Sequence, residues 1–149
     1  MRWLTFLVLA LGLGACSQAT SLDNQLSGMF SNGTGVAYDV RSVSSSTYDA
    51  TCAYTAARSN EKVQIARNLL YRGLTHVKKD GYDFVVVQGP YSATLTHRQM
   101  QYGREMWRQD YPGLKYSLIG YKSGSGEKPA KAVSTDSLLA QLAPQVTDK

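Results

Sequence analysis

Apolar residues recur at three- and four-residue steps over residues 60–80. The recurring positions are Val63, Ala66, Leu70, Leu74 and Val77. This spacing places them on one face of an amphipathic helix. Ser59 or Asn60 can accept hydrogen bonds from the first free amides, and Gly81 can adopt the left-handed conformation that ends a helix. The segment therefore predicts a long helix with one buried face.

Alternation of apolar and polar residues predicts strands on both sides of this helix. Residues 36–40 and 48–54 alternate, and the serine run 44–46 between them predicts a turn that makes them an antiparallel hairpin. Residues 82–88 are apolar on both faces, which is typical of a strand inside a sheet. Residues 114–121 alternate in part and predict a further strand.

Two further segments complete the expected fold. Residues 91–112 show no decisive period, and we expect a short helix or an irregular crossover there. Residues 136–142 predict a short C-terminal helix that Pro144 closes. The order of elements predicts an α+β fold, with a small, mainly antiparallel sheet of about four strands. The long helix packs on one face of this sheet, which gives two layers.

The first sixteen residues have the layout of a secretory signal. One arginine precedes an apolar run that is too short to span a bilayer. The run ends in Leu13-Gly14-Ala15-Cys16, which resembles the bacterial lipobox, where the cysteine thiol takes a diacylglycerol and becomes the mature N-terminus. Ordinary cleavage after Ala19 is the alternative. Two or three acyl chains would hold the protein on a membrane.

The expected organisation follows from this reading. Residues 1–15 form a lipoprotein signal peptide, and residues 16–35 form the lipidated cysteine and a flexible polar tether. Residues 36–144 form one α+β domain, and residues 145–149 form a tail. By resemblance to sorted lipoproteins, Ser17 favours the outer membrane, facing the periplasm, over the inner membrane.

The formal net charge of +5 allows contact with anionic partners. We expect the membrane itself, through the N-terminal lipid, and an envelope protein or an anionic envelope polymer as partners. The basic residues are dispersed and the chain is expected to be exported, so we do not expect nucleic acid as a partner.

Few residues point to chemistry. Cys16 and Cys52 are the only cysteines, and Cys52 is expected to be a buried small apolar residue. The two histidines, His76 and His97, do not provide the converging ligands of a metal site. In the glycine-rich segment 120–126 the lysine precedes the glycines and no helix follows, unlike a phosphate-binding loop. We predict no catalytic residue, no cofactor and no metal.

Polar residues at one end of the long helix have a structural interpretation. We expect Asp83 to accept amide hydrogen bonds or to pair with Arg72, beside Tyr71 and Tyr82. The alternative is an envelope hydrolase with a site around Tyr71, Asp83 and His97.

One segment is a candidate for recognition, because Tyr, Trp and Arg are enriched among residues that dominate interface energies. Completion of a small core by the same rings is the alternative. The candidate interaction surface comprises Tyr102, Arg104, Trp107, Arg108 and Tyr111.

The segment Asn68-Leu69-Leu70-Tyr71-Arg72-Gly73-Leu74, followed by Gly81-Tyr82-Asp83 and a hydrophobic strand, resembles a family of small uncharacterised proteobacterial lipoproteins. The resemblance covers roughly residues 36–144 and implies export and lipidation without an assigned activity. Gly73 stands where relatives often have alanine, which favours a close contact between helix and sheet. We therefore expect a membrane-anchored envelope lipoprotein that binds or scaffolds and is not an enzyme.

Overall fold

A computed structural model describes residues 35–124 and 126–147, which form an α+β fold. The elements are β1 (Val36–Ser42), β2 (Thr47–Tyr54), η1 (Ala56–Glu61), α2 (Lys62–Lys79), β3 (Phe84–Gln101), β4 (Arg104–Tyr121), β5 (Val133–Ser134), α3 (Thr135–Leu142) and η2 (Ala143–Gln145). The predicted signal peptide, the lipobox with Cys16 and the tether up to residue 34 lie outside the described residues.

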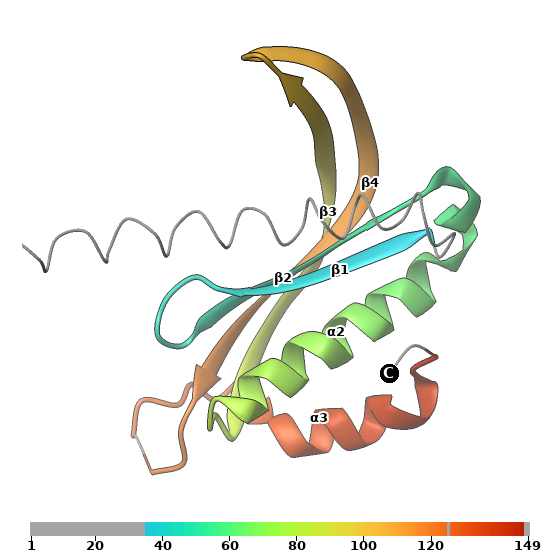
Figure 1. Cartoon of the computed structure of the whole chain (residues 1–149). Helices are drawn as coiled ribbons and strands as arrows, with labels where there is room; N and C mark the ends of the chain where they lie inside the picture. Colours follow the sequence, from blue (N-terminus) through green and yellow to red (C-terminus); the bar gives the residue numbers. More distant parts are fainter. Residues whose placement is uncertain (1–34, 125, 148–149) are drawn as a thin grey trace, which may run out of the picture.

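The five strands form one antiparallel sheet in the order β1-β2-β4-β3-β5. Helices α2 and α3 lie on the same side of this sheet (Figure 1). The predicted α+β class is thus confirmed. The sheet has five strands instead of about four, because the two-residue β5 adds an edge strand that is too short to leave a periodic pattern in the sequence.

The β1–β2 hairpin forms where the alternation predicts it. Its register pairs Val40 with Ala50, and the Val43 amide donates to the Thr47 carbonyl at 2.8 Å to close the turn. Alternate residues of β2 point toward the helices, where Tyr48, Ala50 and Cys52 are buried. A half-buried hairpin of this kind follows directly from a two-residue period.

The ends of α2 differ in how well the sequence predicts them. At the N-terminal end a 3₁₀ turn, η1, precedes the helix, and Glu61 occupies the cap position without a side-chain cap bond. The prediction that Ser59 or Asn60 caps the helix is therefore wrong; the Ser59 hydroxyl donates to the Ala56 carbonyl. At the other end Gly81 has φ +92°, and its amide donates to the Lys78 carbonyl, as predicted.

The buried face of α2 includes most of the expected stripe, since Leu74 and Val77 are fully buried and Ala66 and Leu70 pack against the core. Ile65 and Leu69 are fully buried, whereas Val63 is 66% exposed. The close helix–sheet contact expected at Gly73 is confirmed, because a Cβ there would lie 2.6 Å from Cδ1 of Leu118. The sheet approaches the helix at this small residue, which fixes the rotation of α2.

The C-terminal segment up to Thr147 is bound to α2 by the amide side chains of Gln64, which donates to the Gln145 carbonyl, and of the buried Asn68. Asn68 donates to the Tyr38 hydroxyl at 3.3 Å and to the Thr147 hydroxyl at 3.2 Å, and its carbonyl oxygen accepts from the Thr147 amide at 3.2 Å. Gln64 donates to the same oxygen at 3.0 Å. Asn68 is 1% exposed. Residue 147 of the predicted tail is therefore part of the folded unit.

The largest departure from prediction is at residues 91–112. They form neither a short helix nor a crossover, but continue β3 and β4 into a long hairpin that projects from the sheet (Figure 1). We call residues 91–112 the arm. At its tip Tyr102 and Gly103 have φ 51° and 73°, the left-handed values of a tight two-residue hairpin turn.

Proline marks the base of the arm on both strands. Gln88 pairs with Ser117 and Tyr91 pairs with Lys115, so Gly89 and Pro90 form a bulge in β3. On β4, pairing with β2 ends at Gly113, and the next residue outward is Pro112. Proline has no N–H for a further ladder bond. The arm therefore begins where the pairing of β4 with β2 ends.

Candidate functional site

The outer part of the arm is exposed on both strands. Every residue from 101 to 110 is exposed, and the large apolar side chains among them do not enter the core. The exposed fractions are 95% for Tyr102, 61% for Met106 and 58% for the neighbouring Met100. Apolar side chains grouped on a projecting element are typical of an interaction site.

The hairpin register determines which side chains of the arm are neighbours. Gln99 pairs with Trp107 and Met100 pairs with Glu105, so Met106 is the extra residue of a bulge in β4. The His97 and Trp107 rings meet edge to face, with centroids 5.3 Å apart. A bulge changes the direction of side chains on one strand. Apolar groups thus lie on both faces of the arm near its tip.

Charged residues occupy the middle of the arm. Arg98 pairs with Arg108 across the two strands, which brings two positive charges side by side. Asp110 lies 3.6 Å from the Arg108 guanidinium and accepts a 2.6 Å hydrogen bond from Thr96. This hydrogen bond, with the charges of Arg108 and Arg98, holds the pKa of Asp110 below its usual range. Asp110 therefore stays ionised and offsets part of the arginine charge.

The composition of the arm is that of a protein interface. Residues 91–112 contain three arginines and no lysine, together with two methionines, three tyrosines and one tryptophan. Arg, Met and aromatic residues are enriched at protein–protein interfaces, whereas Lys is depleted. Glu105 and Asp110 leave the arm with a small positive charge.

Four of the five residues of the predicted interaction surface belong to the exposed part of the arm: Tyr102, Arg104, Trp107 and Arg108. Tyr111 does not, since it is only 5% exposed and packs with Ala37 and Ala53 on the sheet face opposite the helices. Met100 and Met106 were missed, because only the hairpin register places them beside Tyr102.

The polar residues after α2 form a structural junction that matches the prediction in part. Lys78 Nζ lies 3.1 Å from the Asp83 carboxylate and 3.0 Å from that of Asp136. The Ser123 hydroxyl donates to Asp83 at 2.7 Å, and this bond and Lys78 hold the pKa of Asp83 below its usual range. Asp83 thus joins α2, the β4–β5 loop and α3.

Of the two expectations for Asp83, acceptance of an amide hydrogen bond is confirmed, since the Ser123 N–H donates to its carboxylate at 3.4 Å, whereas pairing with Arg72 is wrong. The Arg72 guanidinium lies over the Tyr38 ring, 4.6 Å from its centroid. The three residues of the hydrolase alternative also have separate surroundings, since Tyr71 lies within α2, Asp83 in the junction, and His97 against Trp107 in the arm. The fold does not assemble them into one site.

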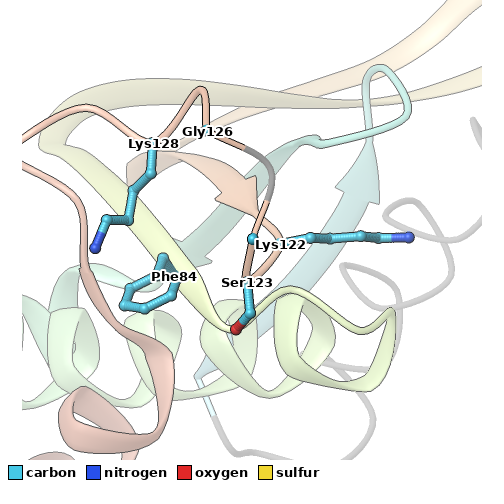
Figure 2. Close-up of a pocket in the computed structure, with 6 residues that line it drawn as sticks. Phe84, Lys122, Ser123, Gly126 and Lys128 are labelled. Atoms are coloured by element: carbon cyan, nitrogen blue, oxygen red, sulfur yellow. The ribbon is translucent and has the colours of Figure 1, made fainter.

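A cavity of about 450 Å³ lies beside the start of β3. Its lining residues are Phe84, Lys122, Ser123, Gly124, Gly126 and Lys128. Figure 2 shows Lys128 extending beside the Phe84 ring and Lys122 pointing away from it. Lys128 Nζ is 4.0 Å from the Phe84 centroid, whereas Lys122 lies over Tyr82. The two ammonium groups do not converge, so they do not form a site for one anion.

Other reactive groups of the described chain are few. Burial raises the pKa of the Cys52 thiol to about 11, and the residue is fully buried, as expected. Within residues 35–124 and 126–147, no group of three or more His, Cys, Asp or Glu side chains could hold a metal ion. None of the helices described there is long and apolar enough to cross a membrane.

Comparison of the chain with models of protein families, with curated protein sequences and with solved structures finds no match.

Proposed function

We propose that this protein is a lipid-anchored bacterial envelope protein that binds another envelope protein through its arm and has no catalytic role. The observation that carries the proposal is the exposed apolar and arginine-rich tip around Tyr102. An isolated two-stranded ribbon is only marginally stable in water. A projecting ribbon with exposed methionines is therefore best explained by a partner that covers it.

The anchor half of the proposal is supported by the sequence Leu13-Gly14-Ala15-Cys16 and by the resemblance to small proteobacterial lipoproteins. Acyl chains on Cys16 would hold the protein at a lipid surface. Ser17 favours the outer membrane, facing the periplasm. The expected tether would let the folded part stand about 25 Å from that surface.

The dimensions of the arm support binding at a distance. Residues 91–101 of β3 span about 35 Å along the ribbon, at about 3.3 Å per residue. The tip therefore lies well outside the helix–sheet body. A partner can surround it without contacting α2 or α3.

The chemistry of the tip favours a protein over lipid or an anionic polymer. Insertion into a bilayer would bring Glu105 and the neighbouring glutamines Gln99 and Gln101 close to hydrocarbon, which is costly for polar groups. A polyanion would need a row of cations, but Arg98 and Arg108 share Asp110. A protein groove with acidic and apolar walls fits the mixture of Arg, Met and Tyr.

Site-specific photocrosslinking in the native envelope tests the arm. A photoreactive residue at position 102 should give one predominant crosslinked protein, because this side chain lies at the apex. The matched control is position 63, where Val63 is 66% exposed on the far helix. The Arg104→Ala exchange should weaken the crosslink. Equal crosslinking from positions 102 and 63, or crosslinking from 102 to lipid only, would refute binding of a protein by the arm.

The anchor is tested separately by fractionation and intact mass. The mature N-terminal peptide should begin at Cys16 and carry the mass of the acyl groups. The Cys16→Ala variant should leave the membrane fraction. A mature chain that begins at Thr20 would refute the lipid anchor and leave the arm result unaffected.

A further inference from the structure

The two outer edges of the arm differ in how they are protected against pairing with another strand. The β4 edge carries Arg104, Glu105, Arg108 and Asp110, a bulge at Met106, and proline at its base. Charges, bulges and prolines are the features by which proteins prevent edge-to-edge association. The β4 edge is therefore closed to strand addition.

On the β3 edge these features lie only at the ends of the segment 91–97, with the bulge at Gly89 and Pro90 before it and Arg98 after it. Residues 91–97 read Tyr-Ser-Ala-Thr-Leu-Thr-His and contain no Lys, Arg, Asp, Glu, Gly or Pro. Among the described strands, only β5 pairs with this side of β3, at Phe84 and Val85. An uncharged, regular edge with high β propensity is suited to the addition of a strand.

We infer that residues 91–97 pair antiparallel with the same residues of a second copy of this chain. The two-fold axis would pass through Thr94, which would face Thr94 of the other copy. In this register Ala93 faces Leu95, and Ser92 faces Thr96. Contacts between identical surface patches are the usual basis of two-fold dimers.

The register matches side chains on both faces of the ribbon. On one face Tyr91 lies opposite His97, and the small Ala93 lies opposite the larger Leu95. On the other face Thr94 would face Thr94, and Ser92 would face Thr96, whose hydroxyl proton is donated to Asp110. Aromatic pairs and Thr–Thr or Thr–Ser pairs opposite one another stabilise antiparallel sheets. The segment is thus complementary to itself in an antiparallel alignment.

The flanking residues limit the pairing to these seven positions. In the same register Arg98 would face Pro90, which cannot donate a ladder bond. Pairing with a strand of a different protein would not require residues 91–97 to be complementary to themselves. Their self-complementarity therefore favours a second copy of this chain as the added strand. The tips, with Tyr102, stay outside the paired region and remain available to the proposed partner.

The dimer is expected to be weak in solution. Seven residues provide about 23 Å of paired edge, which is less than a standard interface. Confinement to one membrane, which rests on the proposed lipid anchor, would raise the effective concentration of the two copies. The pairing is therefore tested with the full-length chain in its own membrane.

Disulfide trapping tests the register directly. The Thr94→Cys chain should give a covalent dimer on mild oxidation, because its two thiols would face each other across the axis. The Ser92→Cys and Thr96→Cys chains should stay monomeric when expressed singly and should form a mixed dimer when expressed together. The unaltered chain controls for Cys16 and Cys52.

A charge on the axis provides the second test. Thr94→Lys would place two ammonium groups opposite each other across the axis. When it is added to the Ser92→Cys and Thr96→Cys chains, the yield of their mixed disulfide dimer should fall to background. The matched Gln109→Lys exchange, on the β4 edge, should leave that crosslinking unchanged. Circular dichroism of each variant should show the fold intact, since Thr94 is exposed.

Three outcomes would overturn the inference. They are a Thr94→Cys chain that remains monomeric while folded, equal dimer yields from Thr94→Cys and Ser92→Cys alone, and a Thr94→Cys crosslink to a different protein. Each result is read from the dimer band, whereas the lipid anchor is read from the membrane fraction, so the two proposals fail independently.

Discussion

The body and the arm belong to the same sheet, but a buried core stabilises the body, whereas strand pairing without such a core forms the arm. In the body, α2 covers β2 and β4, and the buried side chains between them contact one another on every side. In the arm, β3 and β4 pair with no other described strand, and ten consecutive residues are exposed. The body therefore stabilises itself, whereas the arm depends on the strands that anchor it and, in our proposal, on the partner that covers it.

The difference separates residues that maintain the fold from residues free to recognise a partner. Leu69 and Leu118 are fully buried, and their replacement would leave a void in the core. Met100 and Met106 bury little surface on folding, because their side chains are exposed in both the unfolded and the folded chain. Selection for a binding surface can act on the arm without a large effect on the stability of the body.

The largest expected effect comes from a matched pair of truncations. Leu69→Ala should lower the free energy of unfolding by about 3 kcal/mol, because the buried side chain leaves a cavity. Met106→Ala should change it by less than about 0.5 kcal/mol, as for most exposed positions. Denaturant unfolding of the purified protein measures both. Similar losses for the two variants would show that the arm is part of the cooperative core.

An intermediate effect is expected at Asn68, one of the two amides that bind the C-terminal segment. Asn68→Ala removes the four hydrogen bonds that its side chain makes to Gln64, Tyr38 and Thr147, and should cost about 2 kcal/mol. Thr147→Ala, which keeps the backbone bond to Asn68, should cost about 0.5 to 1 kcal/mol. The order of these two losses in thermal unfolding checks the arrangement, and a larger loss for Thr147→Ala would contradict it.

The smallest effect concerns pH and again belongs to the body. The Tyr48 hydroxyl donates a 2.6 Å hydrogen bond to Asp80, and burial, with this bond, raises the pKa of Tyr48 above its usual value of 10.0. Below pH 10 this group adds no pH dependence. Above it the unfolded chain loses the proton first, so stability should fall as pH rises.

The control for this prediction is Tyr48→Phe, which removes the ionisable group. Its unfolding midpoint should be lower at neutral pH, because Asp80 loses its donor, and should fall less between pH 9 and 11 than that of the unaltered chain. Parallel alkaline profiles for the two proteins would show that other groups dominate the titration.

Much of the body could be predicted, because the sequence features that determine it act within a few residues. The two-residue period of β1 and β2, the glycine after α2 and the small Gly73 in the middle of that helix each have a direct structural consequence. The exact buried face of α2 could not be predicted, because several rotations bury four or five apolar residues. The approach of Leu118 and Ala50 to Gly73 selects among them.

The arm could not be predicted for a related reason. Its residues alternate along β3 as Tyr91, Ala93 and Leu95, but the two bulges shift the period, and mixed polar and apolar residues at the tip are compatible with a helix, a loop or a strand. Tyr111 illustrates the limit: an aromatic residue next to arginines in sequence packs against Ala37 and Ala53, which lie far away along the chain.

By itself the sequence determined the fold class, the long helix, the first hairpin and the expectation of a lipid anchor, because periodicity, glycine and a signal motif act over short distances. The tertiary structure alone decided that β3 and β4 continue past the sheet, that Tyr111 is buried while Tyr102 is exposed, and that Asp83 pairs with Lys78. These outcomes depend on which distant segments meet, and the pairing of long strands is a property of the whole fold.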